Sequence, residues 1–158
     1  MNTLGETIGE LCKIILPIPE ESYRGNPNSS IAVCTLSSID LLKKFVNSEI
    51  LNHISIAGRL LSENKGIDSI IKHVNKNQKI TTIIVCGKEV WGHKAGHSLF
   101  QLHKNGVDKN TRIINSTSPD PHLTVPKSEI NYFQNNITLV NLINETDFEI
   151  ILDKIRIS

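Results

Sequence analysis

The 158-residue sequence lacks the features that mark secreted and membrane-spanning chains. Its three cysteines, Cys12, Cys34 and Cys86, are odd in number and far apart. This argues against a disulfide framework and against a cysteine-rich zinc site, and it favours a reducing compartment. No run of about 18 apolar residues is present to cross a membrane, and Glu6 and Glu10 lie where a signal peptide would be apolar. We therefore expect a cytoplasmic chain without a membrane span.

Excess charge and aromatic residues are also scarce. The net charge is +1, and aromatic residues make up only 4% of the sequence. A basic surface for nucleic acid and a stacking platform for bases are therefore both unsupported, so no nucleic-acid partner is expected. A chain of this length can bury a substantial core, and we expect one domain over residues 1–158.

Short β-branched runs alternate with longer runs of helical spacing along the chain. The short runs predict strands, and the longer ones predict helices. The expected strands are residues 31–36, 54–57, 80–86, 112–115 and 137–143. The expected helices are residues 4–16, 39–51, 62–74, 95–105, 128–135 and 146–155, with polar or proline-rich loops at residues 20–30 and 116–126. This alternation predicts an α/β, Rossmann-like three-layer fold with a mostly parallel sheet of about five strands.

The stretch from Lys79 to Asp108 has the most unusual pattern. An apolar strand stops at Gly87, and an amphipathic helix begins near Ala95. The loop between them and the first helical turn hold the only tryptophan, two glycines and two histidines: Trp91, Gly92, His93, Gly96 and His97. Open α/β sheets usually bind ligands outside the carboxyl ends of their strands. The sequence therefore predicts a ligand site here, together with the other strand-to-helix loops.

His93 is the first candidate for chemistry in this loop. Gly92 and Gly96 flank it, so its imidazole can project into a cleft and a flat ligand can approach the backbone closely. Imidazole binds cobalt, iron, nickel or zinc well. A structural interpretation stays open, in which His93 caps its own helix or bonds a loop carbonyl. Trp91 has two interpretations as well, a core or lid residue and a surface that stacks on a planar ligand.

His97 offers a different chemistry, because it lies four residues after His93 on one helical face. A His-x-x-x-His pair can chelate zinc, and Glu89, Asp120 or His122 would have to complete the site. Such a site would suit a metal hydrolase. Against it, a lysine stands where the H-E-x-x-H motif has glutamate.

Four stretches together resemble a known family. Residues 83–108, I-I-V-C-G-K-E-V-W-G-H-K-A-G-H-S-L-F-Q-L-H-K-N-G-V-D, resemble the corrinoid-binding A subunit of tetrahydromethanopterin S-methyltransferase from methanogenic archaea, with its C-G-x-E-V-x-G-H-x-x-G-Q and N-G-V-D. The other three are G-N-P-N-S-S-I-A-V-C-T-L from Gly25, A-G-R-L-L-S-E-N-K-G-I-D from Ala57 and V-N-L-I-N-E-T-D from Val140. The match runs in order over about residues 25–155, and the motifs are specific as a set.

The resemblance implies a single cobalamin-binding domain that holds cobalamin or a 5-hydroxybenzimidazolyl-type cobamide, with His93 as the axial cobalt ligand. It implies a methyl carrier that works with partner methyltransferase subunits, taking the methyl group from methyl-tetrahydromethanopterin and passing it to coenzyme M. A storage, delivery or sensing module without methyl turnover stays open. The loops then predict these cofactor contacts: Leu36, Ser37, Gly58, Gly87, Val90, Trp91, Gly92, His93, Gly96, His97, Ser116, Thr117 and Pro119.

The sequence departs from the family pattern in three places. Trp91 stands where the wider D-x-H-x-x-G corrinoid motif has aspartate, so Glu89 or a backbone carbonyl is expected to orient the imidazole. His97 replaces a glutamine, and residues 115–121 lose two glycines of a loop that contacts the cofactor, which affects the preferred nucleotide tail. The family's C-terminal membrane helix has no counterpart, so we expect a soluble homologue or a soluble domain.

Overall fold

The structure is a computed structural model that describes residues 22–158. The helix predicted over residues 4–16 lies outside the described residues. In chain order the elements are β1 (Ser22–Arg24), β2 (Ile31–Cys34), α2 (Ile39–Val46), a 3-10 helix (Glu49–His53), β3 (Ile56–Gly58), α3 (Lys65–Lys76), β4 (Thr82–Gly87), α4 (Ala95–Asn105), α5 (Lys127–Asn136), β5 (Thr138–Ile143) and α6 (Phe148–Arg156).

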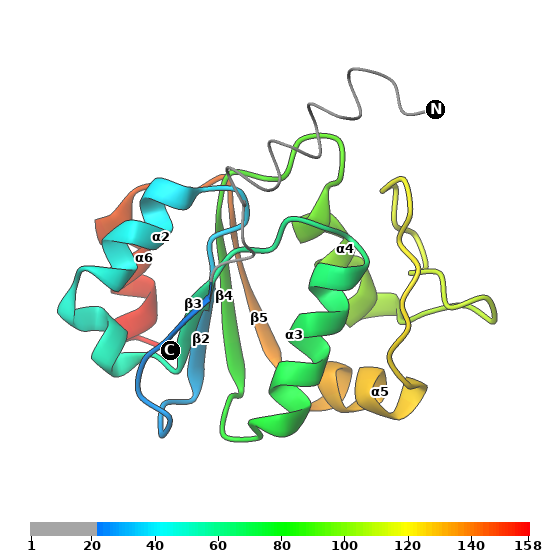
Figure 1. The fold of residues 1–158 in the computed structure, drawn as a ribbon, viewed down its shortest axis with the longest axis horizontal. Coiled ribbons are helices and arrows are strands. Elements are labelled where there is room, and N and C mark those ends of the chain that lie inside the picture. The colour runs from blue at the N-terminus through cyan, green and yellow to red at the C-terminus, as the bar shows by residue number, and fades with distance from the viewer. Residues whose placement is uncertain (1–21) are drawn as a thin grey trace, which may run out of the picture.

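The strands form one five-stranded sheet in the order β1-β3-β2-β4-β5 (Figure 1). β3, β2, β4 and β5 are parallel, and only the short edge strand β1 is antiparallel to its neighbour. Seen edge-on in Figure 1, α2 and α6 cover one face, and α3, α4 and α5 cover the other. The predicted Rossmann-like, three-layer α/β fold is confirmed.

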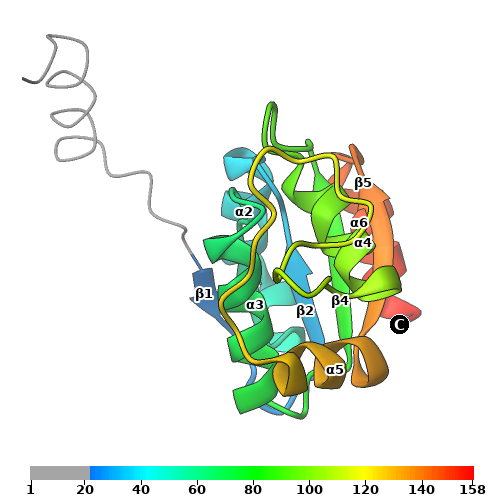
Figure 2. The ribbon, with the colours of Figure 1, turned by 90° about the vertical axis from the view of Figure 1, so that its right-hand side faces the viewer.

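Each face of the sheet has its own hydrophobic core. Figure 2 looks onto the face covered by α3, α4 and α5, whose core includes Ile67, Leu99 and Phe133. The opposite core packs Phe45 of α2 and Ile151 of α6 against the sheet. Residues of β4 alternate between the two cores, because successive side chains of a strand point to opposite faces. An almost wholly apolar β4 is therefore the expected sequence for a strand covered on both sides.

Most predicted elements are confirmed within a few residues, and two assignments are wrong. Residues 112–115 form no strand, because Thr111 and Asn115 both adopt positive φ, near 64°, and break the extended backbone on either side. Only isolated bridges, such as Val107 with Ile113, remain there. The fifth strand is instead β1, within the region predicted as a polar turn. Its three exposed residues carry no apolar pattern, and it forms by pairing with β3.

The carboxyl ends of the parallel strands gather the functional loops, and Gly87 sets their spacing. Gly87 ends β4 with φ of +80°, and a Cβ atom there would lie 2.3 Å from the Thr35 carbonyl oxygen. Ser37 and Ser38, predicted to cap α2, bond the β4 loop instead. The Ser37 hydroxyl donates to the Lys88 carbonyl at 2.8 Å, and the Ser38 hydroxyl accepts from the Lys88 N–H at 2.9 Å. The loops after β2 and β4 are thus tied together.

The helices of residues 22–158 also bear on the membrane question. None of them has both the length and the apolar character that crossing a bilayer requires.

Candidate functional site

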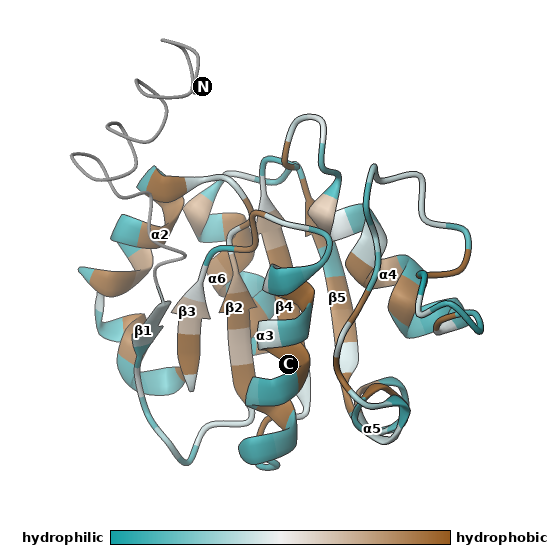
Figure 3. Cartoon of the chain, turned by 45° about the vertical axis from the view of Figure 1, so that its right-hand side comes forward, coloured by the Kyte–Doolittle hydropathy of each residue, from teal (hydrophilic) through white to brown (hydrophobic). Residues whose placement is uncertain are grey.

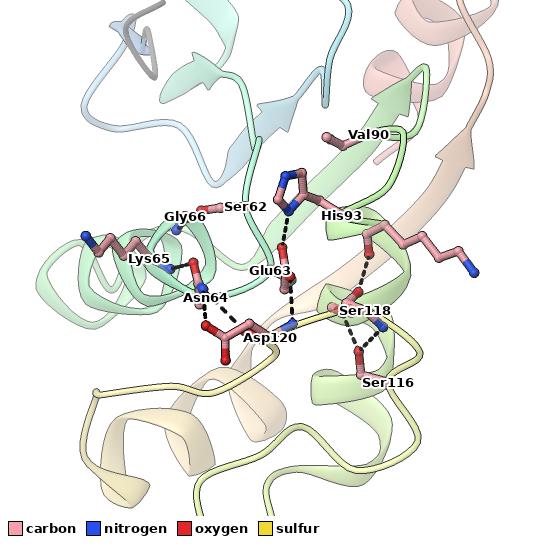
Figure 4. Close-up of polar contacts among 12 residues, drawn as sticks. Ser62, Glu63, Asn64, Lys65, Gly66, Val90, His93, Ser116, Ser118 and Asp120 are labelled. Atoms are coloured by element: carbon pink, nitrogen blue, oxygen red, sulfur yellow. Dashed lines mark hydrogen bonds and ion pairs between the residues drawn. The ribbon is translucent and has the colours of Figure 1, made fainter. Parts of the chain in front are cut away.

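His93 and Glu63 form the centre of the site. His93 belongs to the loop between β4 and α4, and Glu63 precedes α3. The Nδ1 atom of His93 lies 2.9 Å from Oε2 of Glu63 (Figure 4). The Glu63 side chain is 2% exposed, whereas that of His93 is 56% exposed. A buried carboxylate therefore orients an imidazole that remains open to solvent.

Glu63 holds its charge although it is buried. Burial alone would raise the pKa of this carboxyl group, but the backbone N–H groups of Glu63 and Asp120 and the ring of His93 outweigh burial and lower it. The N–H of Asp120 donates to Oε1 at 2.9 Å, so the two carboxylate oxygens serve two different segments. Glu63 is therefore ionised at neutral pH and can only accept hydrogen bonds.

The tautomer of His93 follows from this contact. Because ionised Glu63 only accepts, Nδ1 of a neutral imidazole carries the proton, and Nε2 keeps its lone pair. In Figure 4 the ring nitrogen not bonded to Glu63 points away from it. Metal-binding histidines in proteins commonly show this arrangement, with one nitrogen bonded to a carboxylate and the other facing the metal. His93 thus fits a single imidazole ligand for a transition metal.

Glu89 was expected to orient His93, and the structure gives it another role. Its Oε1 atom accepts hydrogen bonds from the N–H groups of Val90 and Gly96, and its Oε2 atom accepts from that of His97. Glu89 therefore closes the loop onto the first turn of α4, where free N–H groups and the helix dipole favour a negative charge. The orienting group for His93 is Glu63 instead.

Three buried serines fix residues 115–120 against α4. The hydroxyl oxygen of Ser98 lies 2.6 Å from those of both Ser116 and Ser118. The Ser118 hydroxyl also donates to the carbonyl of Lys94, next to His93. Since Asp120 bonds Glu63 two residues later, this segment connects the serine cluster to the His93–Glu63 pair.

Five of the predicted residues lie on the loop after β4 and the first turn of α4, and they differ in environment. Trp91 is 96% exposed, and a Cβ atom on Gly92, which has φ of +79°, would meet no atom within 4 Å. Val90 and Gly96 are buried. Gly96 packs so closely on Glu89 that a Cβ would lie 2.9 Å from its Oε2 atom. The tip is therefore the accessible part of the loop.

His97 does not join His93 in a metal site. Its Nε2 atom lies 3.3 Å from both the backbone N and the hydroxyl of Thr117. Among residues 22–158 no group of three His, Cys, Asp or Glu side chains is placed to hold a metal ion. The ligand set that a metal hydrolase would need is thus not assembled in this part of the chain.

The remaining predicted contacts line the same edge of the sheet. Leu36 is buried with φ of 48°, and Gly58 accepts a hydrogen bond from the Thr35 N–H as β3 ends. Ser116 is buried in the serine cluster, whereas Thr117 and Pro119 are exposed. The structure thus gathers the predicted residues at one edge.

Sequence reasoning did not assign Glu63 a role at the site. It lies in the motif A-G-R-L-L-S-E-N, where the S-E-N also reads as an ordinary helix start. The usable signal was the family pattern T-E-N, in which the same glutamate occurs. Its partnership with His93 spans 30 positions in the sequence, and local spacing cannot reveal a contact of that range.

The lowered pKa of Glu63 predicts a loss of stability in acid. A carboxyl group whose pKa is lower in the folded than in the unfolded state stabilises the fold fully above its ordinary value of 4.5. That contribution is lost as the pH falls through the folded-state pKa. We expect the melting temperature to decline between about pH 5 and pH 3, and to decline less steeply in Glu63→Gln, which has no proton to gain. Identical slopes for the two proteins would contradict the assignment.

Comparison with known proteins places the chain in a family. Residues 16–157 match the MtrA family model, which describes the A subunit of tetrahydromethanopterin S-methyltransferase. The Mtx methyltransferase A subunit of Methanosarcina barkeri is 37% identical over 142 residues, 89% of this chain and 68% of that protein. Methanothermobacter thermautotrophicus has two tetrahydromethanopterin S-methyltransferase A subunits, numbered 1 and 2. The first is 36% identical over 84% of this chain and 54% of its own length, and the second is 33% identical over 89% and 79% respectively.

These relatives differ in how much of their length is matched. The chain spans about half to four-fifths of the length of the curated relatives named here. The matched region contains every described residue of the site, including Glu63 and His93. This chain belongs to the family of tetrahydromethanopterin S-methyltransferase A subunits.

Proposed function

We propose that this chain binds a cobalt corrinoid, either cobalamin or a 5-hydroxybenzimidazolyl-type cobamide, with Nε2 of His93 as the axial ligand of cobalt. The observation that carries the proposal is the contact between the buried carboxylate of Glu63 and the exposed ring of His93. A carboxylate so placed fixes the imidazole orientation and makes Nε2 a better donor. Cobalt is among the metals that imidazole ligands suit.

The surrounding residues have distinct tasks in this proposal. Glu89 keeps the His93 loop closed on α4, so that the imidazole is held in position before the cofactor arrives. Gly92 leaves the loop tip without a side chain, and exposed Trp91 supplies an aromatic surface beside it. Thr117 and Pro119 form an exposed rim on the far side of His97. These groups bind and orient a flat ligand at the carboxyl edge.

The bound corrinoid would supply the cobalt that accepts and donates a methyl group. We propose that the chain carries this group between partner methyltransferase subunits, from methyl-tetrahydromethanopterin to coenzyme M. The names of the relatives, all methyltransferase subunits, support this role. The chain's own residues position the cofactor, and turnover would require those partners.

Reconstitution tests the proposal. The purified protein is mixed with aquocobalamin and passed through a desalting column, and the absorbance of retained cofactor is measured. Trp91 is the only tryptophan, so quenching of its fluorescence reports binding at this loop independently. We expect retained red colour at one equivalent and quenching to the same end point. Colourless protein with unchanged fluorescence would refute corrinoid binding.

Methyl transfer is tested separately from binding. The reduced, reconstituted protein is incubated with methyl-tetrahydromethanopterin and partner subunits from a methanogen, and methylation is followed by the cofactor's absorption spectrum. A methylated cofactor supports the carrier role. Tight binding without methylation would favour the storage, delivery or sensing alternative.

A further inference from the structure

A second feature, a pocket of about 150 Å³ beside α3, is not used by the His93 site. It lies between α3 and the sheet. Its apolar lining includes Ala32, Cys34, Ile56, Ile70, Val74 and Ile83. In Figure 3 no helix lies in front of β1 and β3 next to α3, so this edge of the sheet is less covered than the centre.

The pocket begins at the same edge as the His93 site. Cys34 and Gly58 are paired at the carboxyl ends of β2 and β3, and both line the pocket. From there it follows α3 from Gly66 to Val74, a helical distance of about 12 Å. The loop that leads from Gly58 into α3 also carries Glu63. The pocket and the His93–Glu63 pair are thus two ends of one loop.

The size and lining of the pocket suit one flat aromatic ring. An apolar cavity of about 150 Å³ accommodates a benzene ring. A larger fused ring could place its apolar half inside and its polar half at the mouth. The mouth is polar, because Ser22, Ser69, His73 and Arg59 line it.

A cobamide bound through His93 contains such a ring. Its benzimidazole base can itself ligate cobalt from below, so coordination by Nε2 of His93 displaces the base. A displaced benzimidazole is flat and largely apolar, and burying it is favourable. We propose that the pocket along α3 receives this displaced base, an inference that rests on the proposed function.

The charges near the pocket agree with this occupant. Burial, and secondarily the positive charge of Arg24, lower the pKa of His73, so its ring is neutral at neutral pH and compatible with an aromatic neighbour. Arg59 is half-buried at the carboxyl-edge end, where its Nη2 atom donates to the Ser37 carbonyl. The guanidinium places a positive charge where the phosphate of the nucleotide tail would pass.

Comparing cobalamin with aquocobinamide tests the inference, since cobinamide has the same corrin ring but no nucleotide tail. Both affinities are measured on wild-type protein by Trp91 fluorescence. Cobinamide has no base to displace, so without a base pocket it should bind at least as tightly as cobalamin. With the pocket, we expect cobalamin to bind at least about tenfold more tightly. Equal or tighter binding of cobinamide would overturn the inference.

A pair of variants on α3 locates the effect. Ser69 is exposed and lines the pocket, so Ser69→Phe should fill it, whereas Lys72→Phe adds the same ring at an exposed position outside it. We expect Ser69→Phe to weaken cobalamin binding about tenfold or more and to leave cobinamide binding unchanged. Lys72→Phe should change neither affinity.

The outcomes separate this inference from the proposed function. If Ser69→Phe weakens both corrinoids equally, or weakens neither, the base does not occupy the pocket. If wild-type protein binds neither corrinoid, corrinoid binding itself fails. Circular dichroism of both variants confirms folding, and the wild-type comparison stands even if a variant does not fold.

Discussion

Replacing His93 by alanine should remove the protein's nitrogen ligand from cobalt, whereas His97→Ala should leave it in place. The two histidines are four positions apart, yet only His93 has its ring oriented by a buried carboxylate. His97 bonds Thr117 instead. Loss of a group that orients a metal ligand typically costs about ten- to a hundredfold in metal affinity. We expect the loss of the ligand itself to reach at least the upper end of that range.

The measurement should report the ligand directly. Electron paramagnetic resonance of bound cobalt(II) cobinamide shows nitrogen splitting only from the protein, since this corrinoid carries no base. We expect the splitting in wild type and in His97→Ala, and none in His93→Ala. Splitting that persists in His93→Ala would refute the ligand assignment, and its loss in His97→Ala would move the ligand to the other histidine.

Glu63→Gln tests the same assignment without removing the ligand. A glutamine has one accepting oxygen, but Asp120 N–H and His93 Nδ1–H both donate to this side chain. If the amide NH₂ group faces His93, the imidazole must carry its proton on Nε2, where no lone pair is then left for cobalt. We expect about ten- to a hundredfold weaker cobalt ligation. Unchanged ligation would show that the carboxylate charge is dispensable.

Gly87→Ala should be the most destabilising single change in the His93 loop. The added Cβ would lie 2.3 Å from the Thr35 carbonyl oxygen, and the backbone has φ of +80°. The left-handed backbone costs about 1–2 kcal/mol in a residue with a side chain, and overpacking adds about 1–3 kcal/mol. We expect a loss of about 2–5 kcal/mol in the free energy of unfolding, measured by urea denaturation.

Gly92→Ala is the matched control, because it has nearly the same φ in the same loop. A Cβ atom there would meet nothing within 4 Å, so only the backbone term of about 1–2 kcal/mol should remain. Equal losses for the two variants would mean that close packing at Gly87 is unimportant. The difference between them measures the contact with Thr35.

Most of the fold was predictable from the sequence, because parallel strands and amphipathic helices have distinct periodicities. The apolar run before Gly87 and the spacing of Ala95, Leu99 and Leu102 were sufficient, and these helix residues are indeed buried. The strand predicted at residues 112–115 failed because backbone turns at both ends depend on φ values that composition does not specify. β1 was missed because its pairing partner, not its own sequence, makes it a strand.

The site was predictable in position and only partly in its internal contacts. Strand-to-helix loops meet at one edge of a parallel sheet, which placed His93 correctly among its neighbours. The predicted partner Glu89 was wrong because local sequence proximity favoured it, whereas a carboxylate at that position is satisfied better by the free N–H groups of α4. Glu63 required the folded chain, since α3 brings it to His93 from another loop.

The hydrogen bonding of Glu89 has a consequence for protein engineering. One carboxylate satisfies three backbone N–H groups within nine residues, so the segment from Lys88 to Ser98 carries much of its own framework. Such a segment is a candidate for transplantation into another strand-to-helix junction. The graft would keep its shape and present an imidazole, but without Glu63 the proton could sit on either ring nitrogen. A designer would therefore have to move two segments together to transfer metal affinity.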